Sequence, residues 1–125
     1  MKELVLKRCL KCGALVEVFE DCTCDDCGIK CCGQNMVKVA PNSVDAAFEK
    51  HVPTFEVKGD KIVVKVNHVM QDDHFIEWIV YLTENEETKI CLRPGQEAIA
   101  KFNYKRGAKL YAYCNKHGLW EAEVK

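Results

Sequence analysis

Apolar and polar residues alternate along most of the chain after residue 51, in short runs separated by turn residues. The stretch 54–66, TFEVKGDKIVVKV, alternates on both sides of Gly59-Asp60, a dipeptide typical of a tight hairpin. Similar runs follow, separated by an acidic turn and a Pro-Gly turn: FIEWIVYL, TKICLR, AIAKFNY, AKLYAYC and LWEAEV. About seven short strands at this spacing favour an immunoglobulin-like β-sandwich over a fold of alternating strands and helices.

The first 37 residues have a different pattern, with short apolar stretches around Val5 and at 14–19 that predict only short strands. Chains shorter than about 40 residues bury little apolar surface and usually need a metal or disulfides to fold alone. We therefore expect a mainly β protein in three parts: a small metal-stapled domain at 1–37, a linker at 38–50 and a β-sandwich at 51–125.

The linker contains a predicted helical turn. Pro41 precedes two good helix-capping residues, Asn42 and Ser43, and the short run that they begin ends at Phe48. We expect one of these two residues to cap a short helical turn that leads into the sandwich.

Composition and charge exclude several classes of protein. Hydrophobic residues make up 48% of the 125 residues and charged residues 30%, which is a globular composition. The formal net charge is -1 and the basic residues are scattered, which argues against a nucleic-acid partner. No apolar run approaches membrane-spanning length, and the start, MKELVLKRC, lacks the apolar core of a signal peptide. We expect a cytoplasmic protein with no membrane partner.

Seven of the nine cysteines lie in the first 32 residues. In a chain that looks cytosolic, this many cysteines point to metal binding rather than to disulfides. Two pairs form a strong signal for a tetrahedral site of four sulfur ligands, which suits iron or zinc. The proposed ligands are Cys9, Cys12, Cys31 and Cys32.

Three further cysteines, Cys22, Cys24 and Cys27, lie between the two pairs and leave alternatives open. They allow another ligand set, a second metal ion, or free thiols in a solvated loop. Cys91, in the apolar run TKICLR, is expected to be a small core residue.

All four histidines lie in the second half of the chain, each at a strand end or in a loop, where functional groups concentrate. Cys114 precedes the last of them by three residues. Four imidazoles and one thiolate make a ligand set for a redox-active iron with one position left open. The candidate ligands are His51, His68, His74, Cys114 and His117.

Three segments around these residues resemble the iron site of desulfoferrodoxin, a superoxide reductase: EKHVPTFE at 49–56, NHVMQDDHFIEWI at 67–79 and CNKHGLW at 114–120. The first part of the chain, with CLKCG, VEV and CCGQNM, resembles the desulforedoxin-like domain of that family. Two departures are a longer, cysteine-containing loop between the cysteine pairs and HVM in place of the usual HPM at His68.

The resemblance implies roles for these residues. The four histidines would bind iron in an equatorial plane, with Cys114 as the axial thiolate and a sixth position open. Lys50 would attract superoxide and organise a proton-donating water, and Glu49 would occupy the sixth position in the resting ferric state. A cation beside an open site raises the local concentration of an anionic substrate. Trp78 and Trp120 are expected to pack beside the site rather than to relay electrons.

The resemblance thus implies an enzyme that reduces superoxide by one electron to hydrogen peroxide, with a second iron or a zinc ion in the site of four cysteines. It also implies a rubredoxin-like electron donor and a homodimer. Two alternatives come from other classes of protein: a non-catalytic iron protein that only transfers electrons, and a zinc-stabilised binding module. A superoxide dismutase is a nearer alternative, which the absence of oxygen evolution would exclude.

Overall fold

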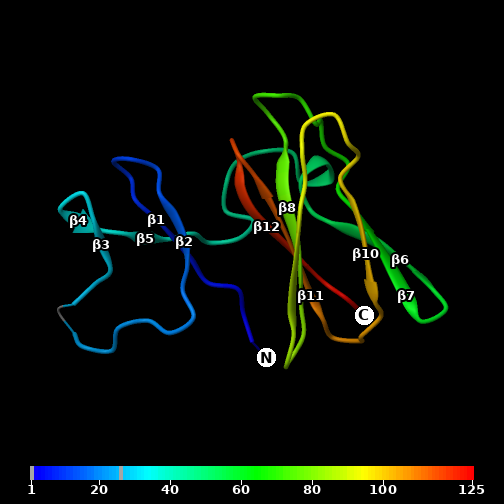
Figure 1. Cartoon of the computed structure of the whole chain (residues 1–125), viewed down its shortest axis with the longest axis horizontal. Helices are drawn as coiled ribbons and strands as arrows, with labels where there is room; N and C mark the ends of the chain where they lie inside the picture. Colours follow the sequence, from blue (N-terminus) through cyan, green and yellow to red (C-terminus); the bar gives the residue numbers. More distant parts are fainter. Residues whose placement is uncertain (1, 26) are drawn as a thin grey trace. The chain divides into compact units, whose positions relative to one another are not determined.

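The computed structural model describes residues 2–25 and 27–125, which divide into two compact units. One unit is Leu4–Ala40, and the other is Pro41–Lys125, to which Lys2 and Glu3 also belong. Strands are the main regular structure in both units (Figure 1). Within the described ranges, no helix is long and apolar enough to cross a membrane.

The larger unit is the predicted β-sandwich, and its seven strands confirm the expected number. All neighbouring strands are antiparallel, in one sheet of order β10-β7-β6 and one of order β12-β11-β8-β9. The strands are β6 Thr54–Lys58, β7 Lys61–Lys65, β8 Ile76–Leu82, β9 Glu87–Cys91, β10 Ile99–Asn103, β11 Lys109–Cys114 and β12 Gly118–Glu123.

Apolar and polar residues alternate along the strands, so one face of each sheet packs into a shared core. Ile62 and Val64 of β7 and Ile79 of β8 are fully or almost fully buried in this core. Burying a large aliphatic side chain stabilises the fold by roughly 1.5–3 kcal/mol. The β6–β7 hairpin turns at Gly59, as predicted, with a positive φ of 64° that favours glycine. This rigid scaffold fixes the loops at its ends.

The smaller unit contains two small sheets (Figure 1). One has the order β2-β1-β5, and the other is the hairpin β3-β4. The strands are β1 Leu6–Arg8, β2 Leu15–Glu17, β3 Lys30–Cys31, β4 Gln34–Asn35 and β5 Val37–Lys38. Strands of two or three residues bury little surface, which agrees with the expected need for a metal.

The predicted helical turn is wrong in its start and its cap. The only turn of helix in this segment is the 3-10 turn η1, Phe48–Lys50, whose N-terminal neighbour Ala47 makes no side-chain cap. Asn42 is engaged elsewhere, because its side chain accepts a hydrogen bond from the Glu121 N–H at 2.8 Å and donates one to the Glu121 carbonyl at 3.2 Å. It therefore fastens the segment to β12 instead of capping a helix.

The expectation that Cys91 is a core residue is also wrong. Cys91 is exposed, as are the other residues of β9. The strand pairs only with β8, so it forms the edge of its sheet. The buried residue of this run is its neighbour Leu92, which is 6% exposed.

Candidate metal centres

Five potential ligands from separate segments meet at one end of the sandwich. His51 follows η1, His68 and His74 lie on the loop between β7 and β8, Cys114 ends β11, and His117 lies in the turn to β12. One donor atom from each lies within 4.8 Å of the others. We call these five residues the histidine cluster.

The four imidazoles form a closed cycle. Ring centroids are 4.7 Å apart for His51 and His68, 4.6 Å for His68 and His74, 5.1 Å for His74 and His117, and 4.9 Å for His117 and His51. Neighbouring rings are steeply inclined, at 70–90° to one another. This arrangement points several ring nitrogens at one centre, whereas packed core histidines have no reason to form a cycle.

The nitrogens that face the centre lie close to each other and to the Cys114 sulfur. His51 Nε2 is 3.1 Å from His117 Nδ1, and Cys114 Sγ is 3.4 Å from His68 Nε2 and 3.8 Å from His117 Nδ1. His74 Nε2 is buried and has no hydrogen-bond partner among the described residues. A buried polar atom without a partner costs free energy, so its place in a donor cluster fits a metal ion.

Hydrogen bonds outside the cluster orient two of the rings. His51 Nδ1 donates to the Ala47 carbonyl at 2.7 Å, and His68 Nδ1 donates to the Val69 carbonyl. A carbonyl only accepts, so these bonds place the proton on Nδ1 and leave Nε2 free to act as a ligand. Such partners fix the tautomer and orientation of histidines that bind metals.

One residue that the sequence did not single out as a structural support holds the cluster in place. The Asn115 side chain accepts from the Phe75 N–H at 3.0 Å and donates to the Asp73 carbonyl at 3.0 Å. It thus joins the Cys114 turn to the His74 loop. Its only signal in the sequence is its position between two ligands, and asparagine in a turn is too common to reveal such a bond.

Trp120 packs beside the site, as predicted. It is fully buried, stacks on His51 with ring centroids 4.8 Å apart, and donates its indole N–H to the His117 carbonyl at 3.1 Å. Trp78, in contrast, stacks on Tyr113 at 5.4 Å.

The environment of the cluster favours the neutral form of two of its imidazoles, His68 and His74. Burial lowers the pKa of His68, and the nearby histidines lower it further. Burial is also the main cause that lowers the pKa of His74, with His117 next. A neutral imidazole is the form that binds a metal, so the site is prepared for a cation.

The second group, which we call the thiol cluster, lies in the smaller unit and contains Cys9, Cys12, Cys31 and Cys32. Cys12 Sγ is 3.6 Å from Cys31 Sγ, which is 3.7 Å from Cys32 Sγ. Only Cys9 of the four is buried. These are the four cysteines that the spacing selected.

Backbone conformation allows the adjacent cysteines to face one centre. Cys32 has a φ of 56°, in the left-handed region that few residues other than glycine adopt, and this turns its side chain to the same side as that of Cys31. The Cys12 N–H lowers the pKa of Cys9 to about 6, while the neighbouring thiols, Cys12 foremost, raise the pKa of Cys31 to about 12. Four crowded thiolates require a cation, so the donor set fits a metal ion.

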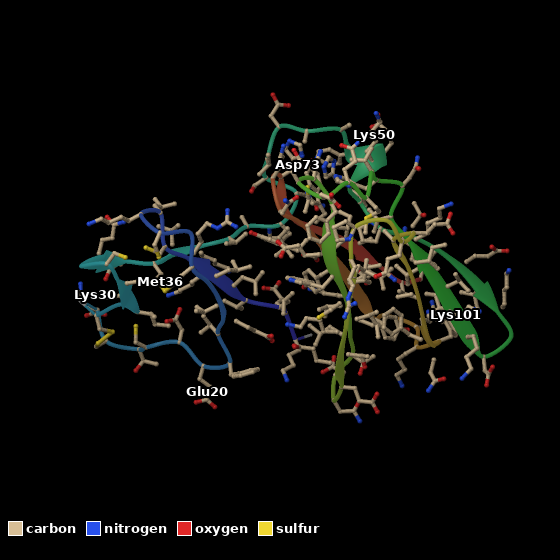
Figure 2. All side chains as sticks on the ribbon, turned by 45° about the horizontal axis from the view of Figure 1, so that its top comes forward. Glu20, Lys30, Met36, Lys50, Asp73 and Lys101 are labelled. Carbon is tan, nitrogen blue, oxygen red and sulfur yellow. A yellow bond between two sulfur atoms is a disulfide. The ribbon has the colours of Figure 1, made fainter. Side chains whose placement is uncertain are left out.

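Glu49 and Lys50 lie in η1, immediately before His51, and both are exposed. Figure 2 shows Lys50 and Asp73 at the same end of the sandwich, with Lys101 away from them. Lys116, between the last two ligands, forms a 3.9 Å ion pair with Asp73. Lys50 is therefore an exposed cation beside the cluster.

The remaining three cysteines of the smaller unit belong to neither cluster. Cys24 and Cys27 are joined by a disulfide, and Cys22 is an exposed free thiol. The expectation that the cysteines form no disulfide is therefore wrong for this pair, whose sulfurs the loop brings to bonding distance. For Cys22, the free thiol is the alternative that the structure shows.

Comparison with known proteins gives consistent matches over the whole chain. A family model described as Desulfoferrodoxin matches residues 43–123. A desulfoferrodoxin of Syntrophotalea carbinolica is 39% identical over 126 residues, which cover 98% of this chain and 98% of the relative. A superoxide reductase of Pyrococcus abyssi is 34% identical over 112 residues, which cover 71% of this chain and 97% of the relative.

Solved structures show the same relationship. The crystal structure of the superoxide reductase from Treponema pallidum has a TM-score of 0.67 and 27% identity, and the match covers 94% of this chain and 98% of that one. A superoxide reductase (1Fe-SOR) from Giardia intestinalis has a TM-score of 0.54 and 26% identity, covering 61% of this chain and 97% of that one.

Proposed function

This chain belongs to the desulfoferrodoxin family, and we propose that it is a superoxide reductase, which adds one electron and two protons to superoxide to give hydrogen peroxide without forming oxygen. The observation that carries this proposal is the cycle of four imidazoles beside a buried cysteine sulfur. This donor set has too many nitrogens for an ordinary structural zinc site and suits iron.

The histidine cluster holds the iron in this proposal. The unpartnered His74 Nε2 and the fixed tautomers of His51 and His68 support ligation through nitrogens that face the centre. Five protein donors leave room for one further ligand, such as a small anion. When bound, the iron supplies the single electron that superoxide takes up, and a thiolate ligand favours this by donating electron density.

The protein residues around the cluster keep the site rigid and partly dry. Cys114 and Trp120 are fully buried, so bulk water does not reach the sulfur. Asn115 ties the two ligand-bearing loops together, and rigid support of this kind holds ligands in place as charge moves. We infer that the fold provides a preorganised site rather than one that assembles around its substrate.

Lys50 attracts the substrate in this proposal. Superoxide is an anion, and the exposed ammonium of Lys50 lies one residue before a ligand. The field of such a cation raises the rate of encounter, and a water held by Nζ donates protons to the reduced product. Glu49, on the same exposed turn, is the proposed ligand of the resting oxidised site.

The thiol cluster holds a second iron ion or a zinc ion, with four sulfur donors that fill a tetrahedral site and leave no position for substrate. Three of its four cysteines lie at least partly at the surface, which suits exchange of electrons with a rubredoxin-like donor. We further propose a cytoplasmic homodimer, for which the support is the family resemblance.

The decisive experiment mixes the reduced, iron-loaded protein with superoxide under anaerobic conditions. We expect one superoxide to be consumed per histidine-cluster iron, with hydrogen peroxide formed and no oxygen evolved. Oxygen evolution would identify a dismutase instead. Oxidation of the iron without consumption of superoxide would leave only an electron-transfer protein, and a colourless protein that contains zinc alone would favour a binding module. A Cys91→Ser variant is the matched control, because it changes an exposed thiol outside both clusters.

A further inference from the structure

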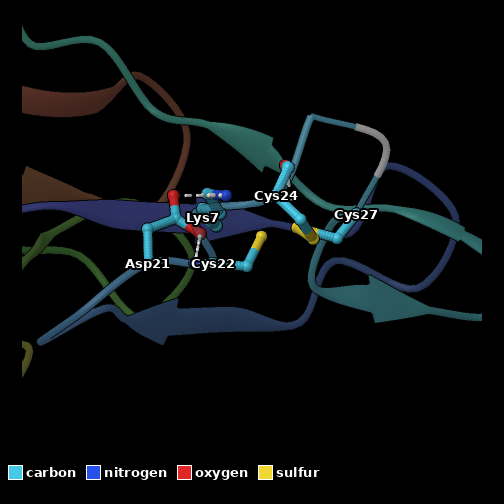
Figure 3. A network of polar contacts seen from close by, with 5 residues as sticks. All are labelled: Lys7, Asp21, Cys22, Cys24 and Cys27. Carbon is cyan, nitrogen blue, oxygen red and sulfur yellow. Dashed lines mark hydrogen bonds and ion pairs between the residues drawn. A yellow bond between two sulfur atoms is a disulfide. The ribbon is translucent and has the colours of Figure 1, made fainter.

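The loop between β2 and β3 carries three cysteines that the two metal clusters do not use: Cys22, Cys24 and Cys27. The start of this loop is fixed by Asp21, which forms a 2.7 Å ion pair with Lys7 of β1 and accepts a 2.8 Å hydrogen bond from the Cys22 N–H (Figure 3). The loop is therefore anchored on the sheet, while its sulfur atoms lie beyond the anchor.

The Cys24–Cys27 disulfide is a poor structural staple. Its Cα atoms are 5.5 Å apart, within the usual range for a disulfide of about 4.4–6.8 Å. The sequence separation is three, and the stabilisation of a cross-link through the unfolded chain grows with the size of the loop it closes. The unit already has the thiol cluster to hold its short strands together. Stabilisation of the fold alone therefore does not explain why Cys24 and Cys27 form a disulfide.

The spacing and exposure of the pair suit redox chemistry. Cysteines separated by two residues are the pattern of dithiol–disulfide oxidoreductases. Cys24 is exposed and Cys27 is partly buried, so the Cys24 sulfur is the one that a small oxidant or an external thiolate reaches first. In Figure 3 the Cys22 sulfur points toward the side of the loop where the disulfide lies.

We propose that Cys24 and Cys27 are a reversible dithiol–disulfide couple that reduces hydrogen peroxide to water with electrons from an external dithiol. The Cys24 thiol loses its proton, the thiolate attacks one peroxide oxygen, and the O–O bond breaks to give a sulfenic acid and hydroxide, which takes up that proton to become water. The Cys27 thiol then loses its proton, the thiolate attacks the Cys24 sulfur, and the S–O bond breaks to give the disulfide and hydroxide, which takes up the second proton to become a second water. A dithiol reductant restores both thiols by exchange and becomes a disulfide itself.

Charge around the pair sets a moderate reactivity. The carboxylate of Asp25, next to Cys24 in the sequence, disfavours the thiolate, which is the reactive form. Among the described residues of the loop, Asp21 has its carboxylate compensated by the ammonium of Lys7. We therefore expect a slower reaction than at a thiol with a cationic neighbour. The partner thiol should nevertheless end the reaction at the disulfide, before irreversible oxidation.

The couple rests on the proposed function only for the source of its peroxide, which is the product of superoxide reduction. Added hydrogen peroxide therefore tests the couple without superoxide. If added hydrogen peroxide does not oxidise the pair, the proposal for the iron site is unaffected. Conversely, a protein that does not consume superoxide can still have a reversible Cys24–Cys27 couple.

In the test, the full metal-loaded chain is reduced with dithiothreitol, desalted without oxygen, and treated with one equivalent of hydrogen peroxide. We expect the loop peptide to lose two hydrogen atoms by mass spectrometry, and to regain them with dithiothreitol. The peptide with Cys91, an exposed free thiol, is the internal control and should gain oxygen or stay unchanged. A loop peptide that gains oxygen atoms instead, or a bridge that resists excess dithiothreitol, overturns the proposal.

Two variants separate the pair from the third thiol. Cys27→Ser should form a sulfenic acid at Cys24 that a chemical probe can trap. In the presence of dithiothreitol, this variant should consume hydrogen peroxide more slowly, because the couple no longer contributes. Cys22→Ser should behave as the unaltered chain. If Cys27→Ser still loses two hydrogen atoms, Cys22 is the true partner and the assignment is wrong. An unchanged far-ultraviolet circular dichroism spectrum and an unchanged metal content establish that the variants are folded.

Discussion

The two clusters differ in the number of donors, in burial and in what surrounds them. The thiol cluster has four sulfurs, and two of its cysteines, Cys12 and Cys32, are exposed. It lies in a unit whose strands are only two or three residues long. The histidine cluster has five donors, with a buried cysteine at its base and rings held by hydrogen bonds to the backbone. A site filled by four ligands can exchange electrons, whereas a site with room for a further ligand can also transform a substrate.

The origin of the ligands explains why the histidine cluster needs a rigid scaffold and the thiol cluster does not. The ligands of the histidine cluster come from four segments, which the seven strands of the sandwich bring to one end. The ligands of the thiol cluster come from two tight turns, and a metal ion itself can hold such turns together. Chemistry at an open site therefore depends on the sandwich, and the thiol cluster depends mainly on its metal.

The strongest test of this comparison is Cys114→Ser. It replaces a buried sulfur ligand by a hydroxyl, which is a far weaker electron donor. We expect loss of the absorption due to sulfur-to-iron charge transfer and a fall of at least ~100-fold in the rate of superoxide reduction, as when a key electrostatic group is removed from an active site. Stopped-flow absorbance measures both.

Cys91→Ser is the matched control, since it removes a sulfur that lies on the edge strand β9. It should alter neither the spectrum nor the rate. If Cys114→Ser keeps the same charge-transfer absorption, the sulfur is not a ligand, and the contrast between the two clusters loses its basis.

The next largest effect should come from Lys50→Ala. Without this exposed cation, the reaction of the reduced protein with superoxide should slow by about tenfold and lose most of its dependence on salt. The iron should remain bound, because Lys50 is not one of the clustered donors. Pulse radiolysis at several ionic strengths measures the rate.

Lys101→Ala is the control for net charge, because this lysine is exposed and lies away from Lys50 (Figure 2). A similar loss of rate in both variants would show that overall charge, and not Lys50, guides superoxide to the site.

The strands and both donor sets could be predicted from the sequence, for different reasons. Alternation and the Gly59 turn determine the hairpin, and the spacing of Cys9 and Cys12 reveals a knuckle. The meeting of His51, His68 and His74 could not be inferred from periodicity, because it depends on how loops from separate strands close. Their placement at strand ends and in loops, together with the donor chemistry of four imidazoles and one thiolate, suggested a shared site, and the likeness to a known family supported it.

The errors have physical causes. Alternation shows that Cys91 and Leu92 face opposite sides of a strand, but not which side is covered, and at an edge strand that depends on tertiary packing. Asn42 has the chemistry of a helix cap, yet its side chain found backbone partners on β12. The composition of a chain that looks cytosolic argues against disulfides, and nothing in the spacing of seven cysteines in 32 residues singles out the bond between Cys24 and Cys27.

A smaller effect is expected from Cys12→Ser, which removes an exposed donor of the thiol cluster. Its metal should be lost or its spectrum changed, while the rate at which the reduced histidine cluster consumes superoxide should stay within about twofold, because separate compact units behave independently. Turnover driven by a rubredoxin-like donor is measured in parallel. A large fall in the single-turnover rate would mean that the two clusters act as one site.

The smallest effect concerns the anchor of the cysteine loop, the ion pair of Asp21 and Lys7. Hydrogen bonding to Lys7 is the main cause that lowers the pKa of Asp21 below its usual value. A carboxylate with a lowered pKa in the folded state stabilises the fold above its unfolded pKa, and this contribution disappears as the pH falls through the folded value. The carboxyl is substantially exposed, so solvent weakens the effect.

In Asp21→Asn, we expect a slightly lower midpoint of denaturant unfolding at pH 7 and no difference from the unaltered chain below the folded pKa of Asp21. A variant that is equally less stable at both pH values would show that the charge of Asp21 does not fix the loop, since Asn keeps an oxygen that can accept from the Cys22 N–H.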